Sequence, residues 1–347
     1  MSYYGAAAHF SDYLERARML QAGCDADTLC VHSRVLGARE HDALPLVGLR
    51  RRAGSTRHAF DLLMVAAFAT VPPAVAELVA IVARSPESRL VALAELSPLV
   101  EQRLLSIVDG RVHVDARVTG FLRGSRAADP RLAGVMSSRE VAPITVDPTP
   151  VAIVARELGQ HAPLVIEGPA GIGKTTVLVA AAAQRGKTTL IVDLDACDAE
   201  QLALARREAL LQDAVLVLQT RTPGLRKDAH ELVQEGLAVL TTRDGSELVR
   251  TLRGARRIRI GLPPVSLRQR IWSSLLPAAA SELVTFDLCV RYPLSPGAMG
   301  RTAQIAHELA DGREITLAHL ERAAAQLSPA GRQVMPCLGQ VSPQVSA

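Results

Sequence analysis

The feature that most constrains this chain is the octapeptide 168–175, Gly-Pro-Ala-Gly-Ile-Gly-Lys-Thr, which fits the pattern GxxxxGK[ST]. A short β-rich run precedes it and a helix-forming run follows it, which is the context in which this motif binds phosphates. The glycines let the backbone curl until its N–H groups converge on phosphate oxygens, and the N-terminus of the following helix adds a positive dipole end. The pattern therefore predicts a strand–loop–helix unit that binds a nucleotide.

Each position of this loop is a candidate contact for ATP or ADP. Lys174 is expected to reach the β- and γ-phosphates, and Thr175 to offer its hydroxyl to Mg²⁺. Lysine occurs at only two other positions, Lys187 and Lys227, so a lysine at the motif position stands out. The predicted nucleotide-binding residues are Gly168, Pro169, Ala170, Gly171, Ile172, Gly173, Lys174, Thr175 and Thr176.

Helix-like and strand-like runs alternate around the motif. Five βα units predict an α/β fold, a P-loop αβα sandwich with a five-stranded parallel sheet over 151–275. Residues 276–328 are helical again and are predicted to form a lid. The expected strands are 163–167, 188–193, 214–218, 237–241 and 257–261, and the expected helices are 151–158, 174–184, 199–211, 226–235 and 266–275.

The N-terminal part has a mainly helical pattern. Residues 1–60 are helical at first and then irregular, with Arg50–Arg52 in an exposed loop. Residues 61–137 combine helices, expected at 59–70, at 74–84 and near 98–106, with a hairpin around Asp109-Gly110, which predicts a winged-helix-like domain. No basic recognition helix is visible, and this favours a protein partner over nucleic acid. Residues 138–150 are predicted to be a linker and 329–347 a tail.

Composition excludes several other classes of protein. With 48% hydrophobic and 21% charged residues the chain is globular, and a net charge of +4 is too small to indicate nucleic-acid binding. Five cysteines without a CxxC pair argue against a disulfide framework and a structural zinc site, and favour a cytoplasmic location. The apolar stretch 62–76 is short and is broken by Pro72-Pro73, so no membrane span is expected. The N-terminus lacks a signal-peptide pattern.

The acidic side chains that ATP hydrolysis usually needs are missing from the expected strand. Carboxylates there orient Mg²⁺ and polarise the attacking water. The strand 214–218 ends instead in Gln219-Thr220, and Gln219 can hydrogen-bond a water but cannot act as a base. Asp193, at the end of a strand expected at the sheet edge, is the remaining candidate metal ligand. Binding is therefore expected, and hydrolysis is expected to be weak.

Polar residues farther along the chain are candidates for sensing or stabilising the γ-phosphate. Thr242 closes the fourth expected strand. Arg253 and Arg256 lie three residues apart just before the fifth, a spacing that suits arginines projected across a subunit boundary. Arg301 opens a helix of the lid, where it could close on the nucleotide. A surface turn at Thr242 and solvated charges at the three arginines remain the alternatives.

These features together resemble the AAA+ ATPases, a family of ring-forming P-loop proteins with an αβα core and a helical lid. The resemblance covers about 151–328. It implies bound ATP or ADP with Mg²⁺, a homo-oligomer that is a hexameric ring, and an unidentified protein partner that is remodelled or assisted. Within the family, the N-terminal region resembles that of AAA+ ATPases associated with bacterial extracellular contractile injection systems, through the segments 114–124, 129–132, 206–212 and 294–297.

Two other interpretations remain open. Residues 171–176 together with 240–244 (Leu-Thr-Thr-Arg-Asp) also resemble the STAND signalling NTPases, which are nucleotide-gated switches. That resemblance implies that Arg243 meets the γ-phosphate within its own subunit. The winged-helix-like region leaves a DNA-binding regulator as the third reading, which salt-dependent DNA binding would support.

Overall fold

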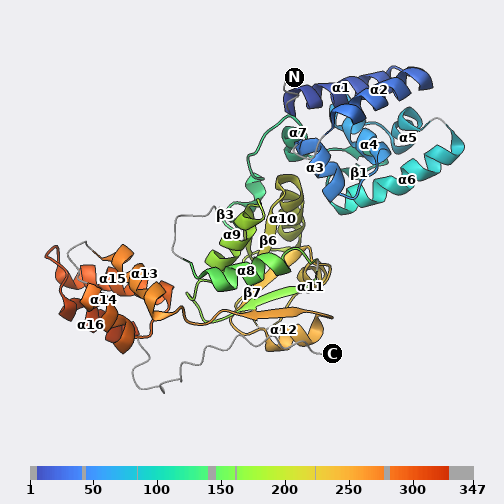
Figure 1. Cartoon of the computed structure of the whole chain (residues 1–347). Coiled ribbons are helices and arrows are strands. Elements are labelled where there is room, and N and C mark those ends of the chain that lie inside the picture. The colour runs from blue at the N-terminus through green and yellow to red at the C-terminus, as the bar shows by residue number, and fades with distance from the viewer. Residues whose placement is uncertain are drawn as a thin grey trace. The chain divides into compact units, whose positions relative to one another are not determined.

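The computed structural model describes residues 6–40, 44–83, 85–139, 146–160, 162–222, 224–276 and 282–327 (Figure 1). The chain divides into two compact units, Met1–Ser137 with Cys197–Ala214, and Ser138–Ala196 with Val215–Ala347. The predicted tail 329–347 and residues 140–145 of the predicted linker lie outside the described residues. None of the helices in the described ranges is both long and apolar enough to cross a membrane.

Helices form most of the first unit. Sequence analysis expected irregular chain after the first helix, and this was wrong, because residues 26–39 and 45–52 are helical. The Asp25 carboxylate caps the first of these helices at Thr28 N, 2.8 Å away. The N-terminal helices are α1 (Ala6–Gln21), α2 (Ala26–Arg39), α3 (Pro45–Arg52), α4 (Arg57–Phe68), α5 (Val75–Val82), α6 (Pro86–Glu101) and α7 (Ala116–Leu122).

Two local predictions in this unit need correction. Arg50 lies in helix α3 and not in an exposed loop, and its guanidinium pairs with the Glu40 carboxylate at 2.8 Å. The third helix, expected near 98–106, is α6 and starts at Pro86. Its start is fixed by Ser85, whose hydroxyl accepts from Ser88 N at 3.1 Å, and by proline in the first turn.

The hairpin expected around Asp109-Gly110 is present. Strands β1 (Ser106–Val108) and β2 (Arg111–His113) pair antiparallel. Asp109 and Gly110 both have positive φ, 49° and 70°, as a two-residue type I′ turn requires. Ala74 forms an isolated antiparallel bridge to Arg111. The order α4, Ala74, α5, α6 and hairpin is the order of elements in a winged helix, and that interpretation remains a prediction.

Helix α10 (Ala199–Gln212) belongs to the first unit, although the sequence prediction included it in a domain spanning 151–275. Its Arg207 side chain is 1% exposed and pairs with the buried Asp129 carboxylate. The neighbouring Glu208, fully buried, pairs with Arg117 Nε at 2.9 Å. Buried charges need partners of opposite sign. The partners of α10 lie on residues 115–129, which explains its grouping with the N-terminal residues.

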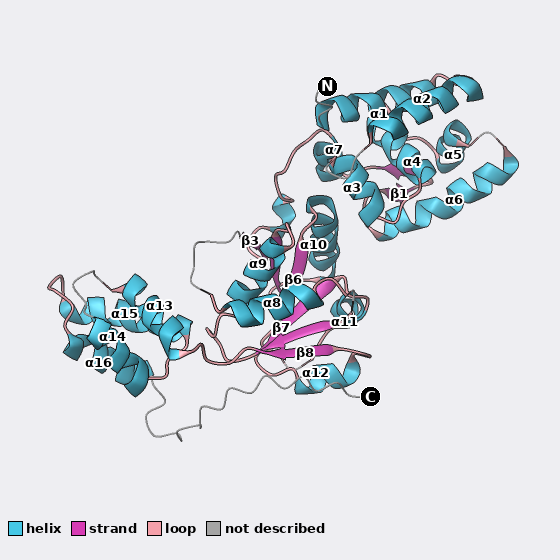
Figure 2. Cartoon of the chain, in the orientation of Figure 1, coloured by secondary structure: helices cyan, strands magenta, loops and turns pink. Residues whose placement is uncertain are grey.

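The second unit contains a six-stranded sheet in the order β3-β5-β6-β7-β4-β8, of which Figure 2 shows the strands in magenta. The pairs β5/β6, β6/β7, β7/β4 and β4/β8 are parallel, as predicted. Five strands were predicted; the sixth, β3, has the sequence Met-Ser-Ser-Arg, which carries no apolar run. The strands are β3 (Met136–Arg139), β4 (Leu164–Glu167), β5 (Thr189–Asp193), β6 (Val215–Gln219), β7 (Ala238–Thr242) and β8 (Arg256–Arg259).

Strand β3 occupies the sheet edge, so β5 lies inside the sheet and not at its edge as expected. One apolar cluster joins the sheet to helices α8 (Pro148–Glu157) and α9 (Lys174–Gln184), through buried residues such as Val154, Leu178 and Ile166. Helix α11 (Lys227–Gln234) packs against β7. The short helix α12 (Ser246–Thr251) was not predicted.

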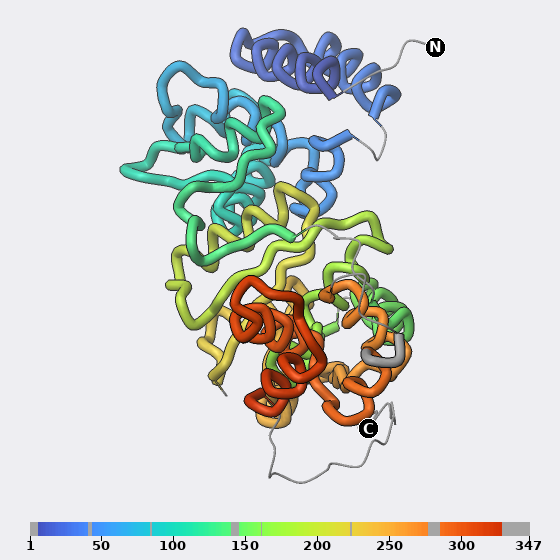
Figure 3. The backbone as a smooth tube through the Cα atoms, turned by 90° about the vertical axis from the view of Figure 1, so that its left-hand side faces the viewer, coloured from blue at the N-terminus to red at the C-terminus, as the bar shows by residue number. Residues whose placement is uncertain are grey.

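Helices α14 (Glu282–Arg291), α15 (Pro296–Ala310) and α16 (Leu317–Leu327) lie in the predicted lid 276–328. Helix α13 (Val265–Leu275), which the sequence analysis placed in the αβα domain, packs against α14 and α15 and belongs with them. Figure 3 shows them in orange and red. They share an apolar cluster of their own, which includes the fully buried Trp272 together with Leu288, Met299 and Leu320. This separate core makes the lid a compact element that begins directly after β8.

The Arg207–Asp129 pair gives a stability prediction. Asp129→Asn removes the closer of the two carboxylates that pair with the buried Arg207 guanidinium and leaves Asp115, at 3.3 Å, as its charged partner. We expect the free energy of unfolding to fall by about 3 kcal/mol. Glu200→Gln on the same helix, which removes an exposed pair with Arg103, should cost less than about 1 kcal/mol. Urea unfolding measures both; equal losses would contradict the role of the buried pair.

The Asp129 carboxylate also predicts a dependence of stability on pH. Hydrogen bonds from Arg131, and the charge of Arg207, lower the pKa of Asp129 below its ordinary 3.8. Stability from a lowered carboxyl pKa is present above the unfolded value and is lost as the pH falls through the folded value. The wild type should therefore lose more stability below pH ~4 than Asp129→Asn does.

Candidate nucleotide-binding site

The predicted strand–loop–helix arrangement is present. Strand β4 ends at Glu167 and helix α9 begins at Lys174. Gly168 has φ 151°, and a Cβ added there would lie 2.6 Å from the carbonyl oxygen of Ile260. Gly173 caps α9 in the left-handed region, with φ 103°. Only glycine adopts these conformations without strain, so the loop requires the glycines of the motif.

The Lys174 side chain folds back over the first residues of the loop. Its Nζ donates to the carbonyl oxygens of Gly168 at 2.7 Å and of Pro169 at 3.0 Å. Burial, with a contribution from the positive charge of Arg243, lowers the pKa of the Lys174 ammonium. A bound triphosphate would supply the negative charge that this ammonium lacks.

Gln219 reaches the loop from strand β6. Its Nε2 donates to Thr175 Oγ1 at 2.7 Å. The end of this strand therefore faces the Thr175 hydroxyl, the predicted Mg²⁺ ligand, and the group facing it is a neutral amide. Thr242, at the end of β7, is buried and donates from its hydroxyl to the carbonyl oxygen of Asp244 at 3.3 Å.

The carboxylates near this edge of the sheet are held by other partners. Asp193, at the end of β5, accepts from Arg221 Nη2 at 3.0 Å. Asp195 accepts from Thr220 Oγ1 at 3.1 Å and from Arg221 N at 3.0 Å. Asp195 therefore lies beside Thr220, the residue after Gln219.

The site fits Mg²⁺ only in part. The Thr175 hydroxyl is a suitable oxygen ligand. Within the described ranges, no group of three or more His, Cys, Asp or Glu side chains could hold a metal ion. A magnesium ion here would be held by Thr175 and by phosphate oxygens of the nucleotide, and it would polarise the terminal phosphoryl group.

Glu167, buried at the end of β4, is a second residue that sequence reasoning missed. It accepts from Gly245 N at 2.9 Å and from Arg257 Nη2 at 2.8 Å. This bond raises the pKa of the Arg257 guanidinium. Glu167 thereby fixes the loop after β7, which begins at Arg243, to the strand that enters the phosphate-binding loop. An acid at the end of an apolar strand was the available signal.

The lid touches the loop through two glycines. Gly297 N donates to Gly171 O at 2.8 Å, and a Cβ added to Gly297 would lie 2.8 Å from Gly171 Cα. The helix α15 is opened by Pro296 and capped by Ser295, and not by Arg301 as expected. Arg301 lies in its second turn and is exposed.

The structure does not bring Arg253 and Arg256 to this loop. Arg256 is the first residue of β8 and lies opposite Leu164, the first residue of β4, at the end of the strands away from the loop. Its guanidinium pairs with Glu157 of α8. Arg253 is exposed, and its backbone is held by the Gln234 side chain. An action of either arginine on a nucleotide therefore requires a second copy of the chain.

The chain was compared with known protein families, curated proteins and solved structures. No protein-family model and no curated protein matches the sequence. Among solved structures, the chain is similar to the FIGL-1 AAA domain, with 18% identity, a TM-score of 0.43, and coverage of 58% of this chain and 93% of that one. It is similar to a structure titled "Structural Basis for Katanin Self-Assembly", with 15% identity, a TM-score of 0.44, and coverage of 60% of this chain and 94% of that one. It is also similar to a Thermotoga maritima RuvB mutant, with 13% identity, a TM-score of 0.39, and coverage of 51% of this chain and 68% of that one.

The glycine contact predicts how tightly the lid is held. Gly297→Ala would drive a methyl group into the Gly171 backbone, and we expect a loss of about 1–3 kcal/mol in stability together with faster hydrogen exchange at residues 171 and 297. Gly300→Ala is the matched control, because open space surrounds it in the same helix. It should be neutral or stabilising by up to about 1 kcal/mol. Equal effects of the two variants would contradict the contact.

Proposed function

We propose that this protein is an AAA+-type P-loop protein that binds ATP or ADP through residues 168–175. One observation carries the proposal: a glycine loop with an ammonium folded across it, at a helix N-terminus, with a polar side chain from β6 on the Thr175 hydroxyl. Such a loop offers converging N–H groups and a lysine to a triphosphate. The cytoplasm remains the proposed compartment, and the winged-helix-like region remains the proposed partner-binding part.

Replacement of the loop lysine tests nucleotide binding. Lys174→Ala removes a charge-assisted partner of the phosphates, and we expect ATP affinity to fall by roughly 1.5–3 kcal/mol. Lys227→Ala, which removes an ammonium that is 92% exposed, is the matched control and should leave the affinity unchanged. Calorimetric titration with ATP measures both. Unchanged affinity in a folded Lys174→Ala protein would refute the proposed function.

We further propose that hydrolysis is slow. Gln219 can orient a water, but its amide neither accepts a proton nor balances the charge of a metal ion. The nearby carboxylates are engaged: Asp193 by Arg221, and Asp195 by Thr220 and Arg221. Nucleotide in this site would then act mainly as a ligand that holds β6, the loop and the lid together.

Restoring the acids tests this proposal. We expect wild-type turnover well below ~1 s⁻¹. Gln219→Asp with Thr220→Glu should raise it by at least about tenfold. The gain should grow when Asp195→Asn removes the like charge beside position 220, and should vanish with Lys174→Ala. Wild-type turnover at ordinary rates, lost in Asp195→Asn, would instead show that Asp195 supplies the acid.

Two arrangements of arginine distinguish a ring from a switch. In a homo-oligomeric ring, proposed to be a hexamer acting on a protein partner, Arg253 would reach the nucleotide of the adjacent subunit. In a STAND-like switch, Arg243 would act within its own subunit, and its influence on the Lys174 pKa favours that candidate. No feature of the described residues favours the DNA-binding regulator over these two.

The two arginines give opposite predictions. If the ring is correct, ATP should promote oligomers in sedimentation, and Arg253→Ala should lower turnover without changing ATP affinity. If the switch is correct, the protein stays monomeric and Arg243→Ala weakens ATP binding by about tenfold. Arg250→Ala, an exposed arginine of α12, is the control and should change neither property.

A further inference from the structure

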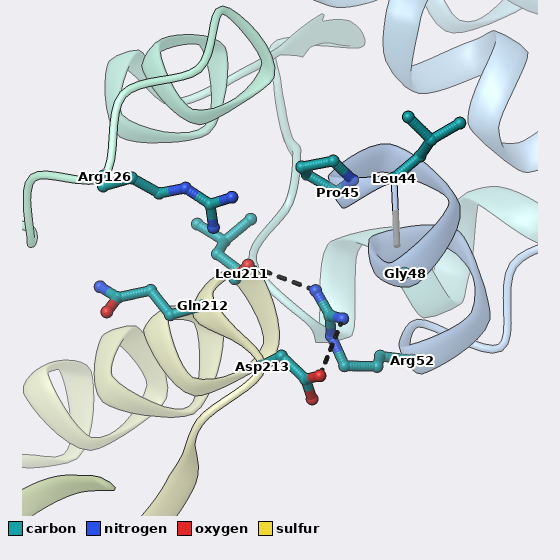
Figure 4. A pocket seen from close by; sticks show the side chains of 8 residues that line it. All are labelled: Leu44, Pro45, Gly48, Arg52, Arg126, Leu211, Gln212 and Asp213. Carbon is teal, nitrogen blue, oxygen red and sulfur yellow. Dashed lines mark hydrogen bonds and ion pairs between the residues drawn. The ribbon is translucent and has the colours of Figure 1, made fainter. Parts of the chain in front are cut away.

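A half-open cavity of about 240 Å³ lies within the first unit (Figure 4). Leu44 and Pro45, at the start of α3, form its apolar wall, and Leu211, in the last turn of α10, forms part of its floor. Arg52 and Arg126 line it from different elements. A cavity of this size takes several atoms of a ligand, and two guanidinium groups select an anionic one.

Arg52 is held in place before any ligand arrives. Its Nε donates to Leu210 O at 2.8 Å and its Nη2 to Leu211 O at 3.3 Å, while Nη1 lies 3.5 Å from the Asp213 carboxylate. Gly48 leaves room for this arrangement, because a Cβ there would lie 2.7 Å from Arg52 Nη1. Burial, together with the charge of Arg126, lowers the pKa of Arg52.

Arg126 supplies the uncompensated charge. Its guanidinium stacks on the Phe121 ring at 5.6 Å, and within the described ranges it pairs with no carboxylate. Asp213 already balances Arg52, so the cavity has a surplus of one positive charge. A carboxylate matches this surplus, whereas a phosphate dianion would exceed it beside Asp213 and the negative end of the α10 dipole.

We propose that this cavity binds an acidic side chain of a partner protein, with its carboxylate between Arg126 and Arg52 and its apolar stem against Leu44 and Pro45. Nucleic acid is disfavoured, because a phosphate backbone needs a row of cations and not a single surplus charge. The proposal shares with the proposed function only the expectation of a protein partner. Its test contains no nucleotide, so either proposal can fail alone.

The test is fluorescence anisotropy of the full chain with a labelled octapeptide of alternating leucine and glutamate. We expect saturable binding that a leucine–glutamine octapeptide does not show. Arg126→Gln should weaken binding by about tenfold. Arg123→Gln is the matched control, because Arg123 stacks on Phe68 at 5.5 Å in the same region but does not line the cavity. Gly48→Ala, which displaces Arg52 without changing charge, should also weaken binding.

Several results would overturn the proposal. They are the absence of saturable binding of the glutamate peptide, equal binding of the glutamine peptide, and an equal loss in the Arg123→Gln control. Competition by a DNA duplex that is itself weakened by Arg126→Gln would assign the cavity to nucleic acid instead.

Discussion

The hydrogen bond from Gln219 to Thr175 joins the two elements on which the site depends, the end of β6 and the first turn of α9. It forms because β6 lies inside the parallel sheet and the carboxyl ends of the parallel strands meet at one edge. In this position a carboxylate would attract a cation, whereas the neutral amide of Gln219 can only donate and accept hydrogen bonds. The proposed chemistry of the protein, binding with slow turnover, follows from that difference.

Around this contact, several elements are anchored to the phosphate-binding loop by backbone or buried side-chain bonds. Glu167 fixes the loop after β7, and Gly297 fixes the start of the lid. These contacts connect residues 167–171 to the loop after β7 and to the lid, so a ligand proposed to order residues 168–175 would also restrain those two elements. Such coupling suits a protein in which nucleotide serves as a structural ligand.

Much of this site could be predicted from sequence, because glycine patterns and apolar alternation act locally. The loop 168–175, helix α9 and the strand ending at Gln219 were predicted to within a residue or two. The grouping of α10 was not, since Arg207 and Glu208 appear as ordinary helix charges until their distant partners are known. Strand β3 was not predicted either, because its four residues have no β-strand pattern of their own and the strand forms by pairing with the neighbouring strand β5. The contacts of Glu167, Asp195 and Gly297 likewise depend on tertiary structure.

The central claim is that this loop binds a triphosphate opposite an amide. Its most direct test is calorimetric titration of the full chain with ATP, once with Mg²⁺ and once with EDTA. The account predicts saturable binding at one site in both, with affinities that differ by less than about tenfold, because no carboxylate anchors the metal to the protein. Loss of binding in EDTA, or no saturable binding in either buffer, would contradict it.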